Sequence, residues 1–253
     1  MKNNYLFNNL KYLINTSKFK LILLLIIINT FYGGFVIAQP GIDVGYINTL
    51  LKIYCNPYFI MILLITITLN IFYVYDIFSK NSEYVIRLGS KKVYFKKLID
   101  NVLFSNLIIF FIQLLLVLTV LNIFYNQNIG IQNIYLGVNN LFYFLFFLFR
   151  VFILMELLTI ICLYLIELIS KQIIFVVIIF ICVSIPIGEN FLILNINNNI
   201  IIPTYIATYF KIYPYNSFFG ELSSSLIFIL FMNLIIFILS KIKFRKKRVV
   251  PII

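Results

Sequence analysis

Long apolar runs alternate along the chain with shorter segments that hold most of the charged residues. A helix of roughly 20 residues rises about 30 Å, the thickness of the hydrocarbon layer of a bilayer. Six runs are predicted to span a membrane: residues 21–38, 58–75, 102–125, 146–169, 173–187 and 222–239. The fourth apolar run starts early, at Leu141, and its first residues are expected to form an interfacial segment before the helix. The pattern predicts a single all-α membrane domain over residues 1–253.

Residues 1–18, before the first span, have the pattern of an amphipathic helix. Its apolar face would hold Leu6, Leu10, Leu13 and Ile14, and its polar face Asn4, Asn8, Lys11 and Asn15. Such a helix lies in the membrane interface with its apolar face toward the lipid. We expect it to anchor the chain at the cytoplasmic surface, or to act as an elbow that also contacts a cytoplasmic partner.

Residues 188–221, between the fifth and sixth spans, combine the polar run NINNN and two prolines with short apolar stretches. Stretches of this length cannot cross a bilayer. The segment is expected to be extracellular or re-entrant, dipping into the outer leaflet, and ordinary surface structure is the alternative.

Residues 76–100, between the second and third spans, hold six basic residues among interleaved Tyr, Phe, Ile and Leu. Residues 82–88 are long enough for two helical turns. The loop is therefore either a set of basic membrane anchors or a short transverse helix presented to a cytoplasmic protein.

A helix break is predicted at the centre of this loop. Gly89 can adopt the positive φ that ends a helix, and Ser90 can cap the next one. The next helix is predicted to start at Lys91 and to run straight into the third span, with Tyr94 and Leu98 on one side.

The basic residues gather on one side of the predicted spans. Of the 20 Lys and Arg, 17 lie in segments on the same side of the membrane as the N-terminus. These segments are the one before the first span, the loops between spans two and three and between spans four and five, and the tail 241–253. Only Lys52 and Lys211 lie on the opposite side, and Arg150 lies within a span. The positive-inside rule then predicts a cell-membrane protein with both termini in the cytoplasm. Topology and anionic lipid explain the net charge of +12, so no nucleic-acid partner is expected.

The composition excludes most kinds of catalytic and nucleotide site. The chain has no histidine, which removes Ser/His and Cys/His nucleophiles and HExxH metal sites. Its nine glycines form neither a GxxxxGK[ST] loop nor a GxGxxG motif. Cys55, Cys162 and Cys182 lack the spacing of a disulfide framework or metal site and are expected to be packing residues. We expect no enzyme activity and no cofactor bound by this chain.

Two ionisable residues in the fourth predicted span, Arg150 and Glu156, are candidates for a translocation path, because charges within a membrane are usually functional. They lie about 240° apart around a helix and are poor partners for each other. Glu156 is expected to act in transport or to be hydrogen-bonded within the bundle, and Arg150 can snorkel outward. Asn70, Asn106 and Gln113 are predicted to be polar contacts between helices.

The central loop carries the run Arg87-Leu88-Gly89-Ser90-Lys91-Lys92-Val93-Tyr94-Phe95-Lys96-Lys97. This run is similar to the R-x-G-S-[RK]-[RK]-x-[YFW] sequence common in the ABC-2 class of ATP-binding-cassette permeases. The whole chain resembles a small membrane subunit of that class from Gram-positive bacteria, in its interfacial helix, its six spans, its basic loop and the segment before the last span.

The resemblance implies that a coupling helix in the loop docks on a separate ABC ATPase subunit. The docking residues would be Tyr84, Ile86, Arg87, Leu88, Gly89, Ser90, Lys91, Lys92 and Tyr94. The partner would bind ATP and Mg²⁺, and two permease chains, as a homodimer or heterodimer, would form the path. Family members of this size often export peptides, including bacteriocins against which the producer must protect itself, or toxic amphiphiles.

Two other classes of protein fit the six predicted spans. An ion-coupled secondary transporter could be built from two inverted halves, although the halves show no matching broken helices. A membrane scaffold or sensor subunit without transport would explain the spans but not the structured basic loop.

Overall fold

The computed structural model describes most of the predicted spans and few of the segments between them. It describes residues 16–37, 46–80, 91–124, 134–135, 138–193 and 217–246. The predicted interfacial helix therefore lies outside the described residues except for its last three positions, and so does most of the segment 188–221. The centre of the basic loop, residues 81–90, also lies outside them.

The described residues are almost entirely helical. The helices are α2 (Ser17–Phe31), the π-helix η1 (Tyr32–Ile37), α3 (Tyr46–Tyr54), α4 (Pro57–Lys80), α6 (Lys91–Phe124), α7 (Asn140–Ile166), α8 (Lys171–Ile193) and α10 (Phe218–Lys246). Two strands of two residues each, β1 (Ile134–Tyr135) and β2 (Val138–Asn139), pair antiparallel just before α7.

Five described helices are long and apolar enough to cross a membrane. They are Ser17–Val36, Pro57–Ser79, Lys92–Ile123, Leu141–Ile166 and Phe218–Lys243. Each overlaps one of the predicted spans. The remaining prediction, at 173–187, falls on α8, whose apolar part among the described side chains is the shorter stretch Lys171–Ser184. The chain is thus an all-α, multi-pass membrane protein.

One prediction about the fourth span is wrong. The residues from Leu141 do not form a separate interfacial segment before it, because α7 begins at Asn140 and continues without a break to Ile166. The side chain of Asn139 accepts a hydrogen bond from the Leu141 backbone N–H at 2.9 Å. This cap satisfies one of the backbone groups that a helix leaves open at its start, so the helix can begin earlier than apolar length alone indicates.

The helices also extend into the segments predicted to connect them. The last helix, α10, begins at Phe218, so Glu221 lies in its first turn and not in the external segment. At the basic loop α4 continues to Lys80, and α6 begins at Lys91 and runs uninterrupted for 34 residues, as predicted. Tyr94 is buried, as is Leu98 one turn later, so this end of α6 packs on the bundle.

The second span begins at a conventional cap. Asn56 accepts hydrogen bonds from the backbone N–H groups of Tyr58 and Phe59 at 3.0 and 3.2 Å, and Pro57 takes the first helical position. The preceding helix, α3, therefore ends before α4 begins. Lys52 of α3 is exposed, whereas its neighbour Leu51 is buried, so α3 is an amphipathic cap on one end of the bundle.

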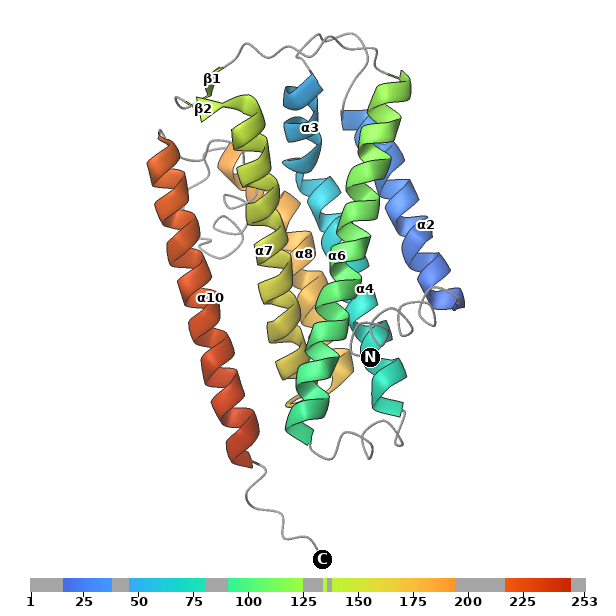
Figure 1. Ribbon diagram of the computed structural model, residues 1–253, viewed down its shortest axis with the longest axis vertical. Helices are drawn as coiled ribbons and strands as arrows, with labels where there is room; N and C mark the ends of the chain where they lie inside the picture. The colour runs from blue at the N-terminus through green and yellow to red at the C-terminus, as the bar shows by residue number, and fades with distance from the viewer. Residues whose placement is uncertain are drawn as a thin grey trace, which may run out of the picture.

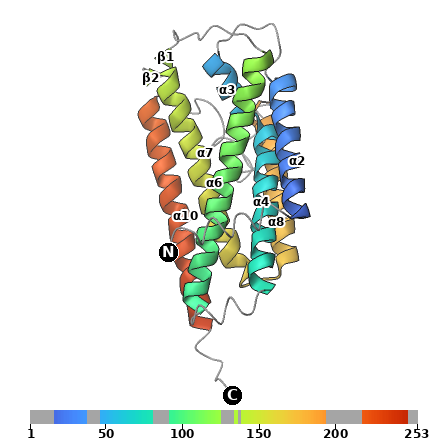
Figure 2. The same ribbon diagram turned by 45° about the vertical axis from the view of Figure 1, so that its right-hand side comes forward.

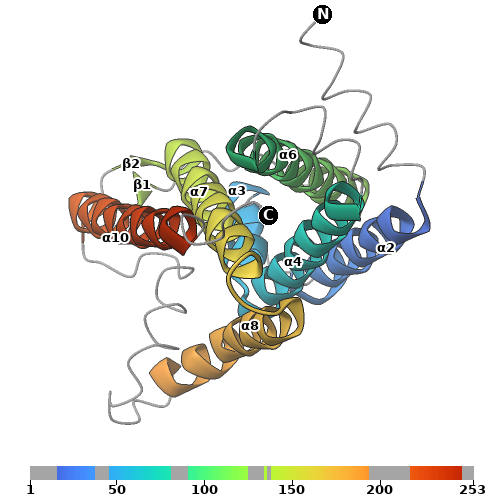
Figure 3. The same ribbon diagram turned by 90° about the horizontal axis from the view of Figure 1, so that it is seen from below.

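The long helices run side by side along one axis, and α3 lies at the upper end of the bundle, above the start of α4 (Figure 1). Figure 2 shows the same bundle from the side, with α10 at one edge and α2 at the other. Seen from below, α4 and α7 occupy the centre, α2 and α8 flank α4, and α10 packs against α7 at the periphery (Figure 3). The ends of α4, α7 and α10 and the starts of α6 and α8 share the lower end.

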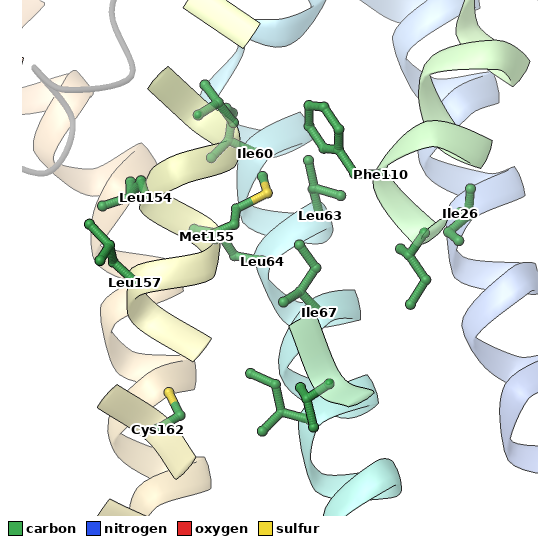
Figure 4. Close-up of a cluster of buried hydrophobic side chains, with 14 of the residues drawn as sticks. Ile26, Ile60, Leu63, Leu64, Ile67, Phe110, Leu154, Met155, Leu157 and Cys162 are labelled. Atoms are coloured by element: carbon green, nitrogen blue, oxygen red, sulfur yellow. The ribbon is translucent and has the colours of Figure 1, made fainter. Parts of the chain in front are cut away.

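The bundle has an apolar core, and its exterior is apolar as well, unlike that of a water-soluble bundle. Ile60, Leu63 and Ile67 of α4 face Met155 of α7 in an apolar core (Figure 4). Many large apolar side chains also cover the outside, and Phe180 is 73% exposed. A hydrocarbon solvent explains an apolar exterior of this kind, because lipid tails are as apolar as the core.

Two glycines allow the end of the first span to pack closely. A Cβ atom on Gly33 would lie 2.9 Å from Cγ2 of Ile53, and one on Gly34 would lie 2.5 Å from Cγ1 of Val120. Real Cβ atoms do not approach neighbours so closely. The absence of a side chain at Gly33 and Gly34 thus lets the end of the first span contact both α3 and α6.

Candidate functional site

An ion pair between α7 and α10 is buried inside the bundle. Nη1 of Arg150, in the third turn of α7, donates to Oε1 of Glu221, and the two side chains are only 2% and 0% exposed. Tyr143, two turns earlier on α7, donates its hydroxyl to the same carboxylate, at 2.7 and 2.9 Å from the two oxygens. The Arg150 guanidinium also lies over the Phe147 ring, 4.9 Å from its centroid.

This cluster determines how α10 is attached. A charge in hydrocarbon is costly unless it is paired and hydrogen-bonded, and Arg150 and Glu221 compensate each other. Many of the large apolar side chains of α10 are exposed, among them Phe219, Leu230 and Phe231. The polar cluster therefore fixes the position of α10 on α7. Apolar contacts alone would not fix it, because α10 can make similar contacts with lipid.

The sequence correctly singles out Arg150 but not its partner. Arg150 neither snorkels outward nor pairs with Glu156; it reaches a carboxylate 71 positions along the chain. Glu221 was missed because it falls one residue outside the predicted last span. The available signal was the arginine itself, since an arginine in mid-membrane requires an acidic partner on some helix.

Glu156, the other candidate, lies on a different face of α7. It is one turn from Phe152, whose ring lies 5.5 Å from that of Phe110 on α6, and one turn from Thr159, which accepts a hydrogen bond from Asn106 on α6 at 2.9 Å. Both carboxylate oxygens of Glu156 are buried and accept no hydrogen bond from the described part of the chain. The structure thus does not join Arg150 and Glu156 into one site.

Polar contacts between the central helices confirm two of the three predicted residues. The Asn70 amide on α4 donates to Ser105 and Asn106 on α6 at 3.0 and 2.8 Å, and Asn106 donates onward to Thr159 on α7. These bonds tie α4, α6 and α7 together in a region without water. Gln113 is also buried, but its amide makes no hydrogen bond within the described residues.

A second charged cluster joins the helices at the lower end of the bundle. Nζ of Lys243 on α10 lies 3.4 Å from Oε2 of Glu167 at the end of α7, and over the Phe95 ring of α6. The Tyr75 hydroxyl of α4 donates to the other oxygen of Glu167 at 3.0 Å. One carboxylate and one ammonium therefore connect four helices.

The lower-end cluster extends to α8 through a further ion pair. Nζ of Lys171, the first residue of α8, donates to Oδ1 of Asp76 near the end of α4. Both side chains are partly exposed, so this pair lies closer to the surface than the Lys243–Glu167 pair. With it, the described helices α4, α7, α8 and α10 are connected at the lower end by ion pairs and a hydrogen bond, and α6 by the contact of Lys243 with the Phe95 ring.

The predicted docking residues lie mostly outside the described part of the chain. This holds for Tyr84, Ile86, Arg87, Leu88, Gly89 and Ser90, whereas Lys91 and Lys92 begin α6. Lys92 is exposed and available to a partner. Tyr94 is buried in the bundle, so a docked protein would meet Lys92 and the exposed Lys96 before it met this ring.

These arrangements hold helices together and place paired charges inside the bundle. Among the described residues, no group of three His, Cys, Asp or Glu side chains could hold a metal ion. The chain matches no known family model, and no curated protein or solved structure is significantly similar to it.

Breaking the buried ion pair should destabilise the protein strongly. Glu221→Gln leaves the Arg150 charge buried without its counter-charge, which should lower the free energy of unfolding by about 3–5 kcal/mol. Replacing both partners, as Arg150→Met with Glu221→Gln, should cost less than the sum of the single changes. Thermal unfolding of the purified protein in detergent, followed by circular dichroism, measures each loss.

Glu156→Gln is the matched control, because it makes the same chemical change in a carboxylate without a hydrogen-bond partner among the described residues. Its unfolding midpoint should remain close to that of the unaltered chain. Equal losses for Glu156→Gln and Glu221→Gln, or additive losses for the two members of the pair, would contradict the assignment.

Proposed function

We propose that this chain is the membrane-spanning permease subunit of an ATP-driven exporter of the ABC-2 class. A separate ABC ATPase would bind ATP and Mg²⁺ and dock on the basic loop, and a second permease chain would complete the path. The chain itself carries out no catalysis. The cargo would be an amphipathic peptide or another toxic amphiphile moved outward, in bacteriocin export or self-immunity.

The observation that carries this proposal is the continuity of the basic run with α6. The helix begins at Lys91, inside the run, and its 34 residues extend for about 51 Å, roughly 20 Å more than a bilayer's hydrocarbon layer. Its first turns therefore project from the membrane, with Lys92 and Lys96 exposed and Phe95 buried against the bundle. A force applied to the loop would move this helix directly.

The lower-end cluster supports the same mechanism. Phe95 of α6 lies under Lys243, and Lys243 pairs with Glu167, which also binds Tyr75. A displacement of α6 by a docked ATPase would therefore reach α4, α7 and α10 through short contacts. Such a chain of contacts is what coupling between ATP hydrolysis and a transport path requires.

We further propose six crossings with both termini in the cytoplasm. Helix α8 has 23 residues and a length of about 34 Å, enough for a sixth crossing. The ends of α4 and α10 and the starts of α6 and α8 carry the basic residues and lie together at the lower end. A cytoplasmic lower end agrees with the positive-inside rule.

The interior favours an amphiphilic cargo over a strongly hydrated one. Arg150 and Glu221 neutralise each other, and the rest of the described interior is largely apolar. At the opposite end of the bundle, the ring of Phe218 lies 5.8 Å from that of Phe142 and 5.1 Å from that of Phe146. Aromatic side chains at this level suit an amphiphile leaving into the interface.

An ion-coupled transporter is the second candidate, and Glu156 is the observation that favours it. Its buried carboxylate, which accepts no hydrogen bond from the described residues, is the kind of group that binds a coupling ion. The two functions differ in their energy source. Coupling by an ion would require Glu156 and no ATPase, whereas the proposed exporter would require the ATPase.

The basic loop should be required for a stable complex with the ATPase. Replacing Ile86 and Leu88 by Glu should release an ATPase that co-purifies with the unaltered chain, because these changes exchange apolar side chains of the proposed docking helix for charged ones. Tyr94 is left unchanged because it is buried, and a substitution there could remove the ATPase by disturbing the fold of the chain. Affinity purification followed by an ATP hydrolysis assay measures the loss.

The control places glutamates at the same spacing on the predicted outer side, as Asn197→Glu with Asn199→Glu, and should retain the ATPase. Both variants should reach the membrane in equal amounts. An ATPase that stays bound to the loop variant, or that never co-purifies with the chain, would refute docking at this loop.

The topology predicts which positions a membrane-impermeant maleimide can reach in intact cells. The native thiols are first removed by Cys55→Ser, Cys162→Ala and Cys182→Ala, and single cysteines then replace Asn128, Asn198, Lys92 or Lys246. The cysteines at 128 and 198 should react from outside, and those at 92 and 246 only after permeabilisation. Reaction at 198 only after permeabilisation would show that α8 does not cross.

A further inference from the structure

An apolar cavity of about 190 Å³ lies between α4, α7 and α8. Ile67 and Thr68 line it from α4, Leu158 and Cys162 from α7, and Ile178 and Cys182 from α8. Helix α8 packs mainly on α4, and Figure 3 shows it set apart from α7. The small thiols of Cys162 and Cys182 leave the space between these two helices unfilled.

The cavity has an interior floor and an outer rim. Its floor includes Ile67, which is 3% exposed, whereas Ile173 and Val177 on its rim are 56% and 47% exposed. In a membrane-spanning bundle, apolar side chains on the outer surface face lipid. The cavity is therefore open toward the lipid.

The depth of the cavity matches one leaflet. Its lining along α8 reaches Cys182, eleven residues beyond Lys171, a distance of about 16 Å, which is close to half the thickness of the hydrocarbon layer. The partly exposed Lys171–Asp76 pair marks the level of the headgroups at this end. The apolar lining thus begins just below the headgroups and ends near the middle of the bilayer.

We propose that this cavity binds the acyl chain of a phospholipid from the leaflet on the Lys171 side. Cavities of about 150 Å³ lined by aliphatic side chains stay dry and bind small hydrocarbons, so a larger one of the same chemistry accepts a segment of a lipid tail. The tail enters sideways over Ile173 and Val177, and its headgroup remains beside the Lys171–Asp76 pair. Export is not required for this binding, which is independent of the proposed function.

The absence of tryptophan from the chain allows a direct test. Val177→Trp places a single fluorophore on the rim, and Phe180→Trp places one on the lipid-facing side of the same helix outside the lining. Phosphatidylcholine brominated in one acyl chain is titrated into the purified protein in detergent. Quenching at position 177 should saturate at about one lipid per chain, and quenching at 180 should rise steadily with the lipid content of the micelle.

Filling the cavity should abolish the saturable quenching at position 177. Cys182→Phe, added to Val177→Trp, occupies the space, and Cys182→Ala is the size control that should retain binding. Lipid bound after detergent purification, counted by native mass spectrometry, should fall from one per chain to none in the filled variant without the fluorophore.

Two results would overturn the proposal. One is quenching by the brominated lipid that rises without saturation at position 177, as it does at position 180. The other is saturable quenching at 177 by a brominated membrane-active peptide and not by the lipid, which would make the cavity a cargo site.

Discussion

The buried ion pair between Arg150 and Glu221 is the interaction on which the arrangement of the last span depends. In a hydrocarbon solvent, an apolar helix gains little free energy by exchanging lipid contacts for contacts with another apolar helix, because lipid tails are as apolar as leucine side chains. Helix α10 exposes most of its apolar surface and rests on α7, where Arg150 and Tyr143 hold its only buried carboxylate. Specific polar contacts of this kind position helices that apolar packing alone would leave free to slide.

The described residues connect the helices differently at the two ends of the bundle. At the upper end, the Arg150–Glu221 pair with Tyr143 joins α7 and α10. Two hydrogen bonds to backbone carbonyls, from Asn29 of α2 to Phe59 of α4 and from Tyr46 of α3 to Leu118 of α6, join other helices there. At the lower end, Glu167, Lys243 and Asp76 connect α4, α6, α7, α8 and α10. Among the described residues, ion pairs therefore connect more helices at the lower end than at the upper end.

The sequence predicts the helices better than their partners. Apolar length locates the spans, because each must cross the same hydrocarbon thickness, and Asn70 and Asn106 prove to be interhelical contacts because an amide in hydrocarbon needs a partner. Apolar length does not identify Glu221, because its helix begins one turn before the apolar run. Its partner Arg150 is also distant in the sequence, so no local pattern joins the two residues. The early start of α7 depends on the Asn139 cap, a local hydrogen bond that hydropathy does not register. The cavity results from the packing of α8 on α4, which the pattern of apolar residues in the sequence does not predict.

Export of a membrane-active peptide is tested most directly in cells that lack this chain. Their survival against a panel of membrane-active peptides should fall and should return when the chain is restored. It should not return with the Ile86→Glu and Leu88→Glu variant, because that variant reaches the membrane without its ATPase. Unchanged survival and peptide export, together with defective uptake of a sugar, an ion or an amino acid, would contradict the account.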